Sequence, residues 1–294
     1  MHVSVVGSGR LGTTTAACLV DIGHDATIVG ADPDTAAAIE AGESPVEEPG
    51  LAPLVSLYGG DRLRATTDYD AVPDGDLTVL AVPAAADAGH ADTDTLAAAA
   101  DAVGNELAGS EAYHLVAVRS PVLPGTTAET VIPALEAASD RTDGTDLGVA
   151  VTPTFQRPGA AVDDFMDPER LVVGSDGDER VLDLLAELYE PLVAGWDVPV
   201  VELGRREAEL LPFADSVAST AQDALVADIA TVCDELDVDA RAVVDALRSA
   251  GHVGDAAGRG PREAHLPTAA ADLAAQVREA GADPAMLDAL AGDE

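Results

Sequence analysis

A short apolar segment at the start of the chain, His2–Val6, runs directly into the sequence Gly7-Ser8-Gly9-Arg10-Leu11-Gly12. Small and apolar residues follow as far as about Ile22, as is typical of a buried helix. A strand before this glycine spacing and a helix after it form the context in which the spacing predicts a Rossmann-type dinucleotide site. We therefore expect a βαβ unit whose first turn binds a pyrophosphate.

Each residue of this turn has an expected role. Gly7 makes the tight turn, Gly9 lets the backbone approach the pyrophosphate, and Gly12 lets the helix pack closely on the strand. Arg10 places positive charge near the phosphates, and the helix is expected to begin at about Leu11. The free N–H groups and the positive dipole end of that helix favour the same anion.

The adenosine end of the predicted site departs from the usual pattern. NAD-binding folds of this type carry an acid at the end of the second strand, where it binds the adenosine ribose. The expected second strand covers residues 26–29, so the acid position falls on Gly30. Asp32, two residues further on, is the candidate substitute. No arginine nearby favours the 2′-phosphate of NADP, so the expected cofactor is NAD, bound weakly.

Apolar segments alternate with helical segments as far as residue 202. The expected strands are 77–82, 114–118, 147–151, 171–174 and 198–202, and the expected helices are 34–40, 93–107, 127–138 and 179–190. This alternation predicts an α/β fold with a doubly wound parallel sheet, which we assign to an NAD-binding domain over residues 1–202.

The pattern becomes helical after residue 203. A long segment, 205–236, has helical periodicity and no glycine, and shorter helices are expected at 239–249, 267–280 and 284–290. A glycine- and charge-rich segment, 251–263, is expected to be a loop. These features predict an all-helical second domain over residues 203–294.

Charge and composition exclude several classes of function. The chain has 54 acidic residues against 15 basic ones, all arginine, and a net charge of -39. Such a charge repels nucleic acid and anionic membrane surfaces. The longest uncharged segments, about ten residues, are too short to span a membrane. The first strand begins near residue 3, so we expect no signal peptide. We expect a cytoplasmic protein that binds neither nucleic acid nor membrane and is adapted to high salt.

Further motifs occur in a fixed order along the chain: Ala41-Gly42-Glu43-Ser44-Pro45, Glu48-Pro49-Gly50-Leu51, Leu63-Arg64-Ala65-Thr66-Thr67-Asp68, Ala81-Val82-Pro83, Pro124-Gly125-Thr126-Thr127 and Phe165-Met166-Asp167-Pro168-Glu169-Arg170-Leu171-Val172-Val173-Gly174. Together with the glycine turn, these motifs resemble the UDP-glucose/GDP-mannose dehydrogenases from residue 1 to about 280. The resemblance implies an NAD domain, a long central helix used in dimerisation and a C-terminal nucleotide-sugar-binding domain; we expect this third domain to be absent. It also adds Val82, Pro83 and Ser120 to the expected cofactor-binding residues.

The resemblance implies a reaction for which this chain lacks the residues. The family oxidises a sugar C6 alcohol to a carboxylate in two hydride transfers, through a thiohemiacetal and a thioester on a cysteine. His265 stands at the position of that cysteine. The other matched positions have lost their threonine, glutamate, lysines, asparagine and aspartate. They hold Pro121, Thr154, Pro212, Ser216, Thr268 and Ala269.

Misalignment does not restore the chemistry, because the chain has no lysine and its two cysteines, Cys18 and Cys233, lie inside expected helices. No metal-ligand spacing is present among the histidines. We therefore expect a catalytically degenerate family member with a role in assembly or regulation.

Two alternatives remain open. The first is an active NAD-dependent oxidoreductase, similar to UDP-glucose 6-dehydrogenase, that acts on a CH–OH group of a nucleotide sugar with His265 or a carboxylate as base. The second is a Rossmann protein of the 6-phosphogluconate dehydrogenase type, a class that also relies on a lysine.

The expected partner is a second copy of the chain or a full-length paralogue. The contact would run along the long helix from about Arg205, with Ala208, Leu211, Ala218 and Leu225 as candidate interface positions.

Overall fold

The protein was analysed as a computed structural model that describes residues 1–83, 86–87, 90–91, 93–194, 198–254 and 268–291. Two compact units make up the chain. Unit 1 comprises Met1–Asp87 and Ala91–Leu211, and unit 2 comprises Ala88–His90 and Pro212–Glu294. The division falls inside the helix α8 (Arg205–Glu235), a few residues beyond the predicted domain boundary at residue 203.

Unit 1 is built on an eight-stranded sheet with the strand order β10-β9-β8-β7-β4-β1-β2-β3. Six neighbouring strands of this sheet, β3, β2, β1, β4, β7 and β8, are parallel, in the order of the dinucleotide-binding fold. This confirms the predicted α/β fold. The strands are β1 (His2–Val6), β2 (Asp25–Val29), β3 (Leu63–Thr66), β4 (Leu77–Leu80), β7 (His114–Val118), β8 (Leu147–Val151), β9 (Leu171–Gly174) and β10 (Val200–Leu203).

One edge of this mostly parallel sheet contains an antiparallel strand pair. β9 runs antiparallel to β8, with Val151 opposite Gly174, and β10 runs parallel to β9. The chain between β8 and β9 contains only α6 (Ala161–Met166), a helix of 6 residues. Such a helix is about 9 Å long, whereas a return along a five-residue strand needs about 16 Å. The segment therefore lacks the long helix that usually connects parallel strands.

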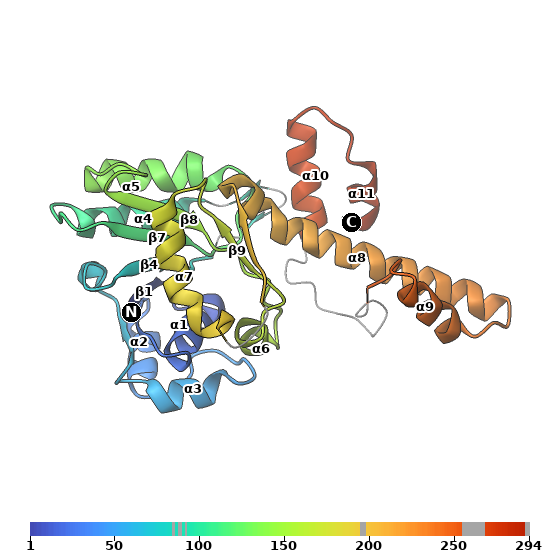
Figure 1. Cartoon of the computed structure of the whole chain (residues 1–294), viewed down its shortest axis with the longest axis horizontal. Helices are drawn as coiled ribbons and strands as arrows, with labels where there is room; N and C mark the ends of the chain where they lie inside the picture. The colour runs from blue at the N-terminus through green and yellow to red at the C-terminus, as the bar shows by residue number, and fades with distance from the viewer. Residues whose placement is uncertain (84–85, 88–89, 92, 195–197, 255–267, 292–294) are drawn as a thin grey trace. The chain divides into compact units, whose positions relative to one another are not determined.

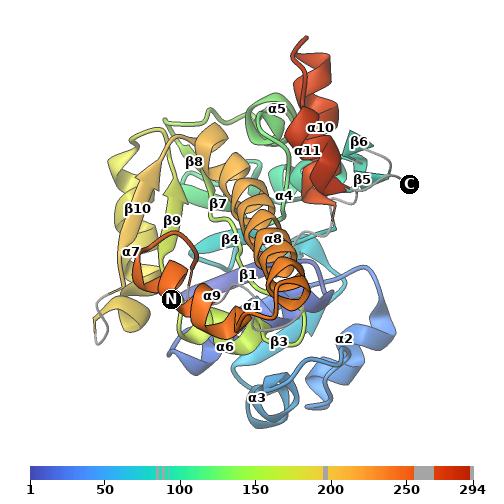
Figure 2. The ribbon, with the colours of Figure 1, turned by 90° about the vertical axis from the view of Figure 1, so that its right-hand side faces the viewer.

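Helices cover both faces of this sheet (Figures 1 and 2). Val3 and Val5 of β1 pack in a core with α1, α3, α6 and α7, whereas Val6 packs on the other face with α4 and α5. Both faces of the central strands are therefore buried, as a doubly wound sheet requires. The helices are α1 (Arg10–Asp21), α2 (Pro33–Glu40), α3 (Leu51–Tyr58), α4 (Asp94–Leu107), α5 (Ile132–Ser139) and α7 (Glu179–Val193), with the short segments η1 (Tyr69–Ala71) and η2 (Thr127–Val131).

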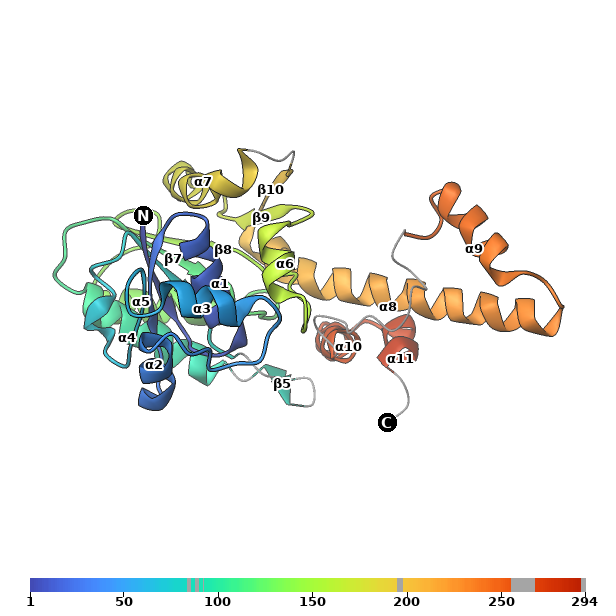
Figure 3. The ribbon, with the colours of Figure 1, turned by 90° about the horizontal axis from the view of Figure 1, so that it is seen from below.

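Unit 2 is mainly helical, as predicted. The later part of α8 packs against α9 (Ala240–Ser249) through Val226, Val244 and Val253 (Figure 3). α10 (Ala269–Glu279) contacts α11 (Ala285–Ala291). A separate small sheet pairs β5 (Ala86–Asp87) with β6 (His90–Ala91). In the described parts of the chain, no helix combines the length and apolar character needed to cross a membrane.

Candidate functional site

The glycine turn between β1 and α1 is closely packed at two of its three glycines. Gly7 has a φ of 122°, and its N–H donates a 2.8 Å hydrogen bond to the Val29 carbonyl at the end of β2. A Cβ at Gly7 would lie 2.5 Å from the Ala81 carbonyl oxygen. A Cβ at Gly12 would lie 1.9 Å from the Gly7 carbonyl oxygen. Only glycine therefore fits at either position, which holds the beginning of α1 against the ends of β1 and β4.

Gly9, in contrast, faces open space. No atom lies within 4 Å of a Cβ built there, and Gly9 is the N-cap of α1. No side chain caps this helix, and its first turn carries no acidic residue. Its first N–H groups are therefore available to an anion, which the positive end of the helix dipole favours. Arg10, the first helical residue, is exposed beside them. The turn fits a pyrophosphate.

The remaining predicted cofactor residues have different surroundings. Ser120, directly after β7, is buried and donates a 2.7 Å hydrogen bond to the Val82 carbonyl. Its hydroxyl therefore fixes the segment that follows β4. Val82 is buried and Pro83 is exposed at the end of the same segment. Leu11 packs its side chain against the core.

At the end of β2, the Ser8 side chain leaves no room for an acidic residue at position 30. A Cβ at Gly30 would lie 2.5 Å from the Ser8 Oγ and 2.6 Å from the Ser8 Cβ. Asp32, the proposed substitute, is the N-cap of α2. Its carboxylate accepts hydrogen bonds from the backbone N–H groups of Asp34 and Thr35, and from the Thr35 hydroxyl at 2.6 Å. These bonds lower the pKa of Asp32 and hold its side chain on its own helix.

The comparison with known proteins agrees with this geometry. Residues 1–193 match the model of the UDP-glucose/GDP-mannose dehydrogenase family, NAD binding domain. The chain belongs to this family. Its glycine turn lies inside the matched NAD-binding domain, so the cofactor of the site is NAD.

Two relatives illustrate the extent of the likeness. The UDP-glucose 6-dehydrogenase AglM of Haloferax volcanii is 40% identical over 295 residues, which cover 98% of this chain and 68% of the relative. The GDP-mannose 6-dehydrogenase of Pseudomonas aeruginosa is 32% identical over 250 residues, which cover 84% of this chain and 56% of the relative. The chain therefore spans only about half to two thirds of the length of these relatives.

Solved structures give the same result. A UDP-glucose dehydrogenase from Pyrobaculum islandicum matches with a TM-score of 0.86 and 30% identity, over 98% of this chain and 66% of that chain. A GDP-mannose dehydrogenase from Pseudomonas aeruginosa matches with a TM-score of 0.79 and 29% identity, over 99% of this chain and 67% of that chain.

The structure places most of the residues that the sequence analysis matched to the chemical positions of the dehydrogenase family. Pro121 follows Ser120 after β7, and the Thr154 hydroxyl accepts a 3.2 Å hydrogen bond from the Gln156 N–H. Pro212 and Ser216 lie on α8. The Thr268 hydroxyl donates to Asp272 at 2.7 Å. Ala269 begins α10, and His265 lies outside the described residues.

Neither cysteine is placed to replace the missing nucleophile. Cys18 lies inside α1 with no exposed surface, and burial raises its pKa to about 12. A thiol with that pKa stays protonated at physiological pH, whereas nucleophilic attack needs the thiolate. Cys233, near the end of α8, is also buried. The sequence-based interpretation of both as small buried side chains agrees with these positions.

Sequence reasoning missed two buried cations, Arg119 and Arg141. Arg119 lies between the sheet and its covering helices, and its polar partners are all neutral: the Thr15 hydroxyl, the Thr152 carbonyl and the Tyr189 hydroxyl. Its guanidinium also lies 5.2 Å from the centre of the Phe165 ring. Arg119 therefore links three helices, α1, α6 and α7, to the segment that follows β8. The sequence signal that could have indicated the burial of Arg119 is its place between an apolar strand and Ser120.

Three buried carboxylates were also missed: Glu48, Glu209 and Asp272. The Glu48 side chain accepts a 2.9 Å hydrogen bond from the Ala161 N–H at the beginning of α6. Glu209, on α8, accepts hydrogen bonds from the N–H groups of Gly125 and Thr127. Glu48 lies in one of the recognised motifs, but nothing in the sequence pattern distinguishes Glu209 from its exposed acidic neighbours.

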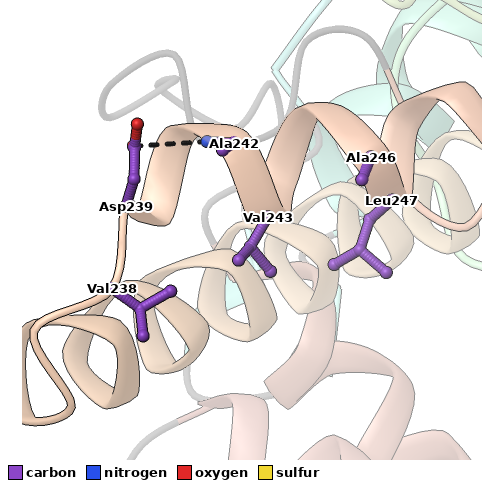
Figure 4. Close-up of a pocket in the computed structure, with 6 residues that line it drawn as sticks. All are labelled: Val238, Asp239, Ala242, Val243, Ala246 and Leu247. Carbon is purple, nitrogen blue, oxygen red and sulfur yellow. Dashed lines mark hydrogen bonds between the residues drawn. The ribbon is translucent and has the colours of Figure 1, made fainter.

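The described residues offer no second site with evident chemistry. They contain no group of three or more histidine, cysteine or acidic side chains that is able to hold a metal ion. A groove in unit 2 is lined by apolar side chains along α9 and just before it, among them Val238, Val243 and Leu247 (Figure 4). Its one carboxylate, Asp239, caps α9 by accepting hydrogen bonds from the Arg241 and Ala242 N–H groups.

Proposed function

We propose that this chain is a catalytically degenerate member of the nucleotide-sugar dehydrogenase family. It would keep the NAD-binding domain, oxidise no sugar, and act in assembly or regulation. One observation carries the proposal: the chain has no lysine, and its cysteines are both buried. The family reaction needs a thiolate nucleophile and a cationic group to stabilise developing negative charge on oxygen. The residues at the matched positions supply neither.

The proposal includes weak binding of NAD. The open N-terminus of α1 at Gly9 and the exposed Arg10 support binding of the pyrophosphate. Gly30 offers no acid to the adenosine ribose, and the Asp32 carboxylate already caps α2. The bound cofactor would supply a hydride acceptor, and the chain's own residues would only bind and orient it.

The proposed partner is a second copy or a full-length relative, bound along α8. Leu225 and Val232 of this helix and Leu236, directly after it, are 50–68% exposed, and a partner helix would cover this apolar set. Of the candidate interface positions, Ala208 is wrong, because it is fully buried against Val151 and Val172 in the chain's own core. Leu211 packs partly against the same cluster, whereas Ala218 and Leu225 are exposed.

The proposed location is the cytoplasm, and nucleic acid and membrane surfaces are not among the proposed partners. The net charge of -39 supports the second statement, because it opposes binding to polyanions.

The proposal is tested by measuring NADH formation from NAD in molar KCl with a panel that includes UDP-glucose and GDP-mannose. A full-length family enzyme serves as the positive control. No NADH above background is expected. Turnover that disappears in the variant His265→Ala would instead support an active oxidoreductase with an altered base, and turnover that survives this variant would assign the chemistry elsewhere; either result contradicts the proposal.

A further inference from the structure

The side chain of Ser8 occupies the place where a side chain of residue 30 would begin. A Cβ at Gly30 would lie 2.6 Å from the Ser8 Cβ, so rotation of the Ser8 hydroxyl would not relieve the clash. The two positions are therefore sterically coupled. Ser8 is compatible with glycine at position 30 and leaves no room for an acid there.

The Ser8 hydroxyl is also available. Ser8 is half-buried, and its carbonyl accepts a 3.1 Å hydrogen bond from the Thr13 hydroxyl, which fixes the backbone of the turn. Within the described parts of the chain, no group forms a hydrogen bond with the Ser8 Oγ. A hydroxyl is both a donor and an acceptor, so it pairs well with another hydroxyl.

The position of this hydroxyl gives it a specific ligand. Ser8 lies in the turn after β1, beside the end of β2, where the adenosine ribose of a dinucleotide binds in this fold. Asp32, the nearest predicted substitute for the acid, uses both carboxylate oxygens at the beginning of α2. The Ser8 side chain therefore lies against Gly30 at the end of β2, whereas the Asp32 carboxylate is engaged on α2.

We infer that Ser8 takes over the role of the missing acid, and that its hydroxyl binds the 2′-hydroxyl of the adenosine ribose above Gly30. This inference rests on the proposed binding of NAD and adds the residue that recognises the adenosine ribose. One neutral hydrogen bond from Ser8 replaces the stronger, charge-assisted hydrogen bonds between an acid and the ribose. This difference accounts for a weak affinity for NAD.

The test is a cycle between a protein variant and a ligand variant. ADP and 2′-deoxy-ADP displace fluorescent NADH from the wild-type protein and from Ser8→Ala in molar KCl. On wild type, 2′-deoxy-ADP should bind about three- to tenfold more weakly than ADP, the factor of one net hydrogen bond. Ser8→Ala should bind ADP more weakly than wild type by a similar factor. It should bind ADP and 2′-deoxy-ADP with equal affinity. Ser44→Ala, which loses a hydroxyl bonded to the Val46 carbonyl, is the matched control and should leave both affinities unchanged.

A second pair of variants tests the steric coupling. Gly30→Asp alone should weaken NADH binding, because its Cβ collides with Ser8. The double variant Ser8→Gly/Gly30→Asp makes room for the acid and should bind NADH more tightly than Ser8→Gly alone.

The outcomes separate this inference from the proposed function. If wild type binds NADH and Ser8→Ala still prefers ADP over 2′-deoxy-ADP, the role of Ser8 is overturned while NAD binding stands. If wild type does not bind NADH, both the role of Ser8 and the proposed cofactor binding are overturned.

Discussion

The carboxylate of Glu209, on the first turns of α8, accepts a 2.7 Å hydrogen bond from the backbone N–H of Thr127. It also accepts a bond from the Gly125 N–H, and Glu209 is only 2% exposed. One side chain thus joins α8 to the loop that follows β7. Within unit 1, this contact holds the beginning of the long helix to the loop at the carboxyl end of β7.

Removal of this carboxylate should destabilise unit 1. Glu209→Gln leaves a single acceptor oxygen for two buried N–H groups, so we expect a loss of about 2 kcal/mol in the free energy of unfolding, and more for Glu209→Ala. Urea unfolding in molar KCl measures this loss. Glu207→Gln, an exposed neighbour on the same helix, is the control and should change stability by less than about 0.5 kcal/mol. Equal losses for the two variants would contradict the bridging role of Glu209.

The glycine turn offers a matched pair of substitutions that separates folding from binding. Gly12→Ala places a Cβ 1.9 Å from the Gly7 carbonyl oxygen, so it should lower the free energy of unfolding by about 3 kcal/mol or prevent folding. Gly9→Ala meets no atom within 4 Å, so it should fold with nearly normal stability. Its added methyl group should nevertheless weaken NADH binding at least tenfold, as measured by fluorescence titration. Normal NADH affinity in Gly9→Ala would place the pyrophosphate elsewhere.

The buried histidine on β7 should make the fold sensitive to acid. His114 bonds to the Thr78 hydroxyl at 2.9 Å, and burial, with the nearby Arg141 charge, lowers its pKa from 6.5 to about 4. Between these values the unfolded chain binds a proton that the folded chain does not. The contribution of neutral His114 to the free energy of unfolding is therefore fully present above about pH 6.5. It is lost as the pH drops towards 4, and this loss is at most about 3 kcal/mol.

Urea unfolding at pH 7.5 and pH 5 tests this dependence. The variant His114→Gln should lose less stability between the two pH values than wild type, because it has no imidazole to protonate. His252→Gln, at an exposed position, is the control and should retain the wild-type loss. His24 acts in the same direction, since burial lowers its pKa as well, so part of the loss should remain in His114→Gln.

Stability should also depend strongly on salt. The net charge of -39 creates repulsion within the folded chain that ions screen, with a Debye length of about 3 Å at 1 M salt against about 10 Å at 0.1 M. We expect the melting temperature to rise steeply between 0.1 M and 3 M KCl. A control with a non-ionic osmolyte should show a smaller rise. A melting temperature that does not change with KCl would remove the interpretation of this composition as a high-salt adaptation.

The central strands of the sheet were predictable because their sequence signals are strong. The strands His114–Val118 and Leu147–Val151 were predicted with their observed bounds, since both are short apolar runs buried on two faces. α3 and β3 were not predicted as elements, and neither was α6, whose 6 residues are too few to show helical periodicity. The antiparallel orientation of β9 depends on how the chain returns to the sheet, and the strand's own sequence does not encode it.

The candidate site was predictable in its motif and not in its contacts. The spacing of Gly7, Gly9 and Gly12 located the turn. That Gly30 is covered by Ser8 depends on two residues far apart in sequence that meet at the ends of adjacent strands. The engagement of Asp32 in capping α2 was more accessible, because Asp followed by Pro and Asp is a frequent beginning of a helix.

The central claim is that this chain binds NAD and transfers no hydride from a sugar, and a single-turnover assay tests it most directly. Purified protein is held in excess over UDP-glucose or GDP-mannose with saturating NAD in molar KCl, and the absorbance of NADH is followed together with the sugar products. We predict no NADH and an unchanged nucleotide sugar. Formation of two NADH for each uronic acid produced would contradict the account, because it would require the complete family reaction from a chain without lysine or an exposed cysteine thiol.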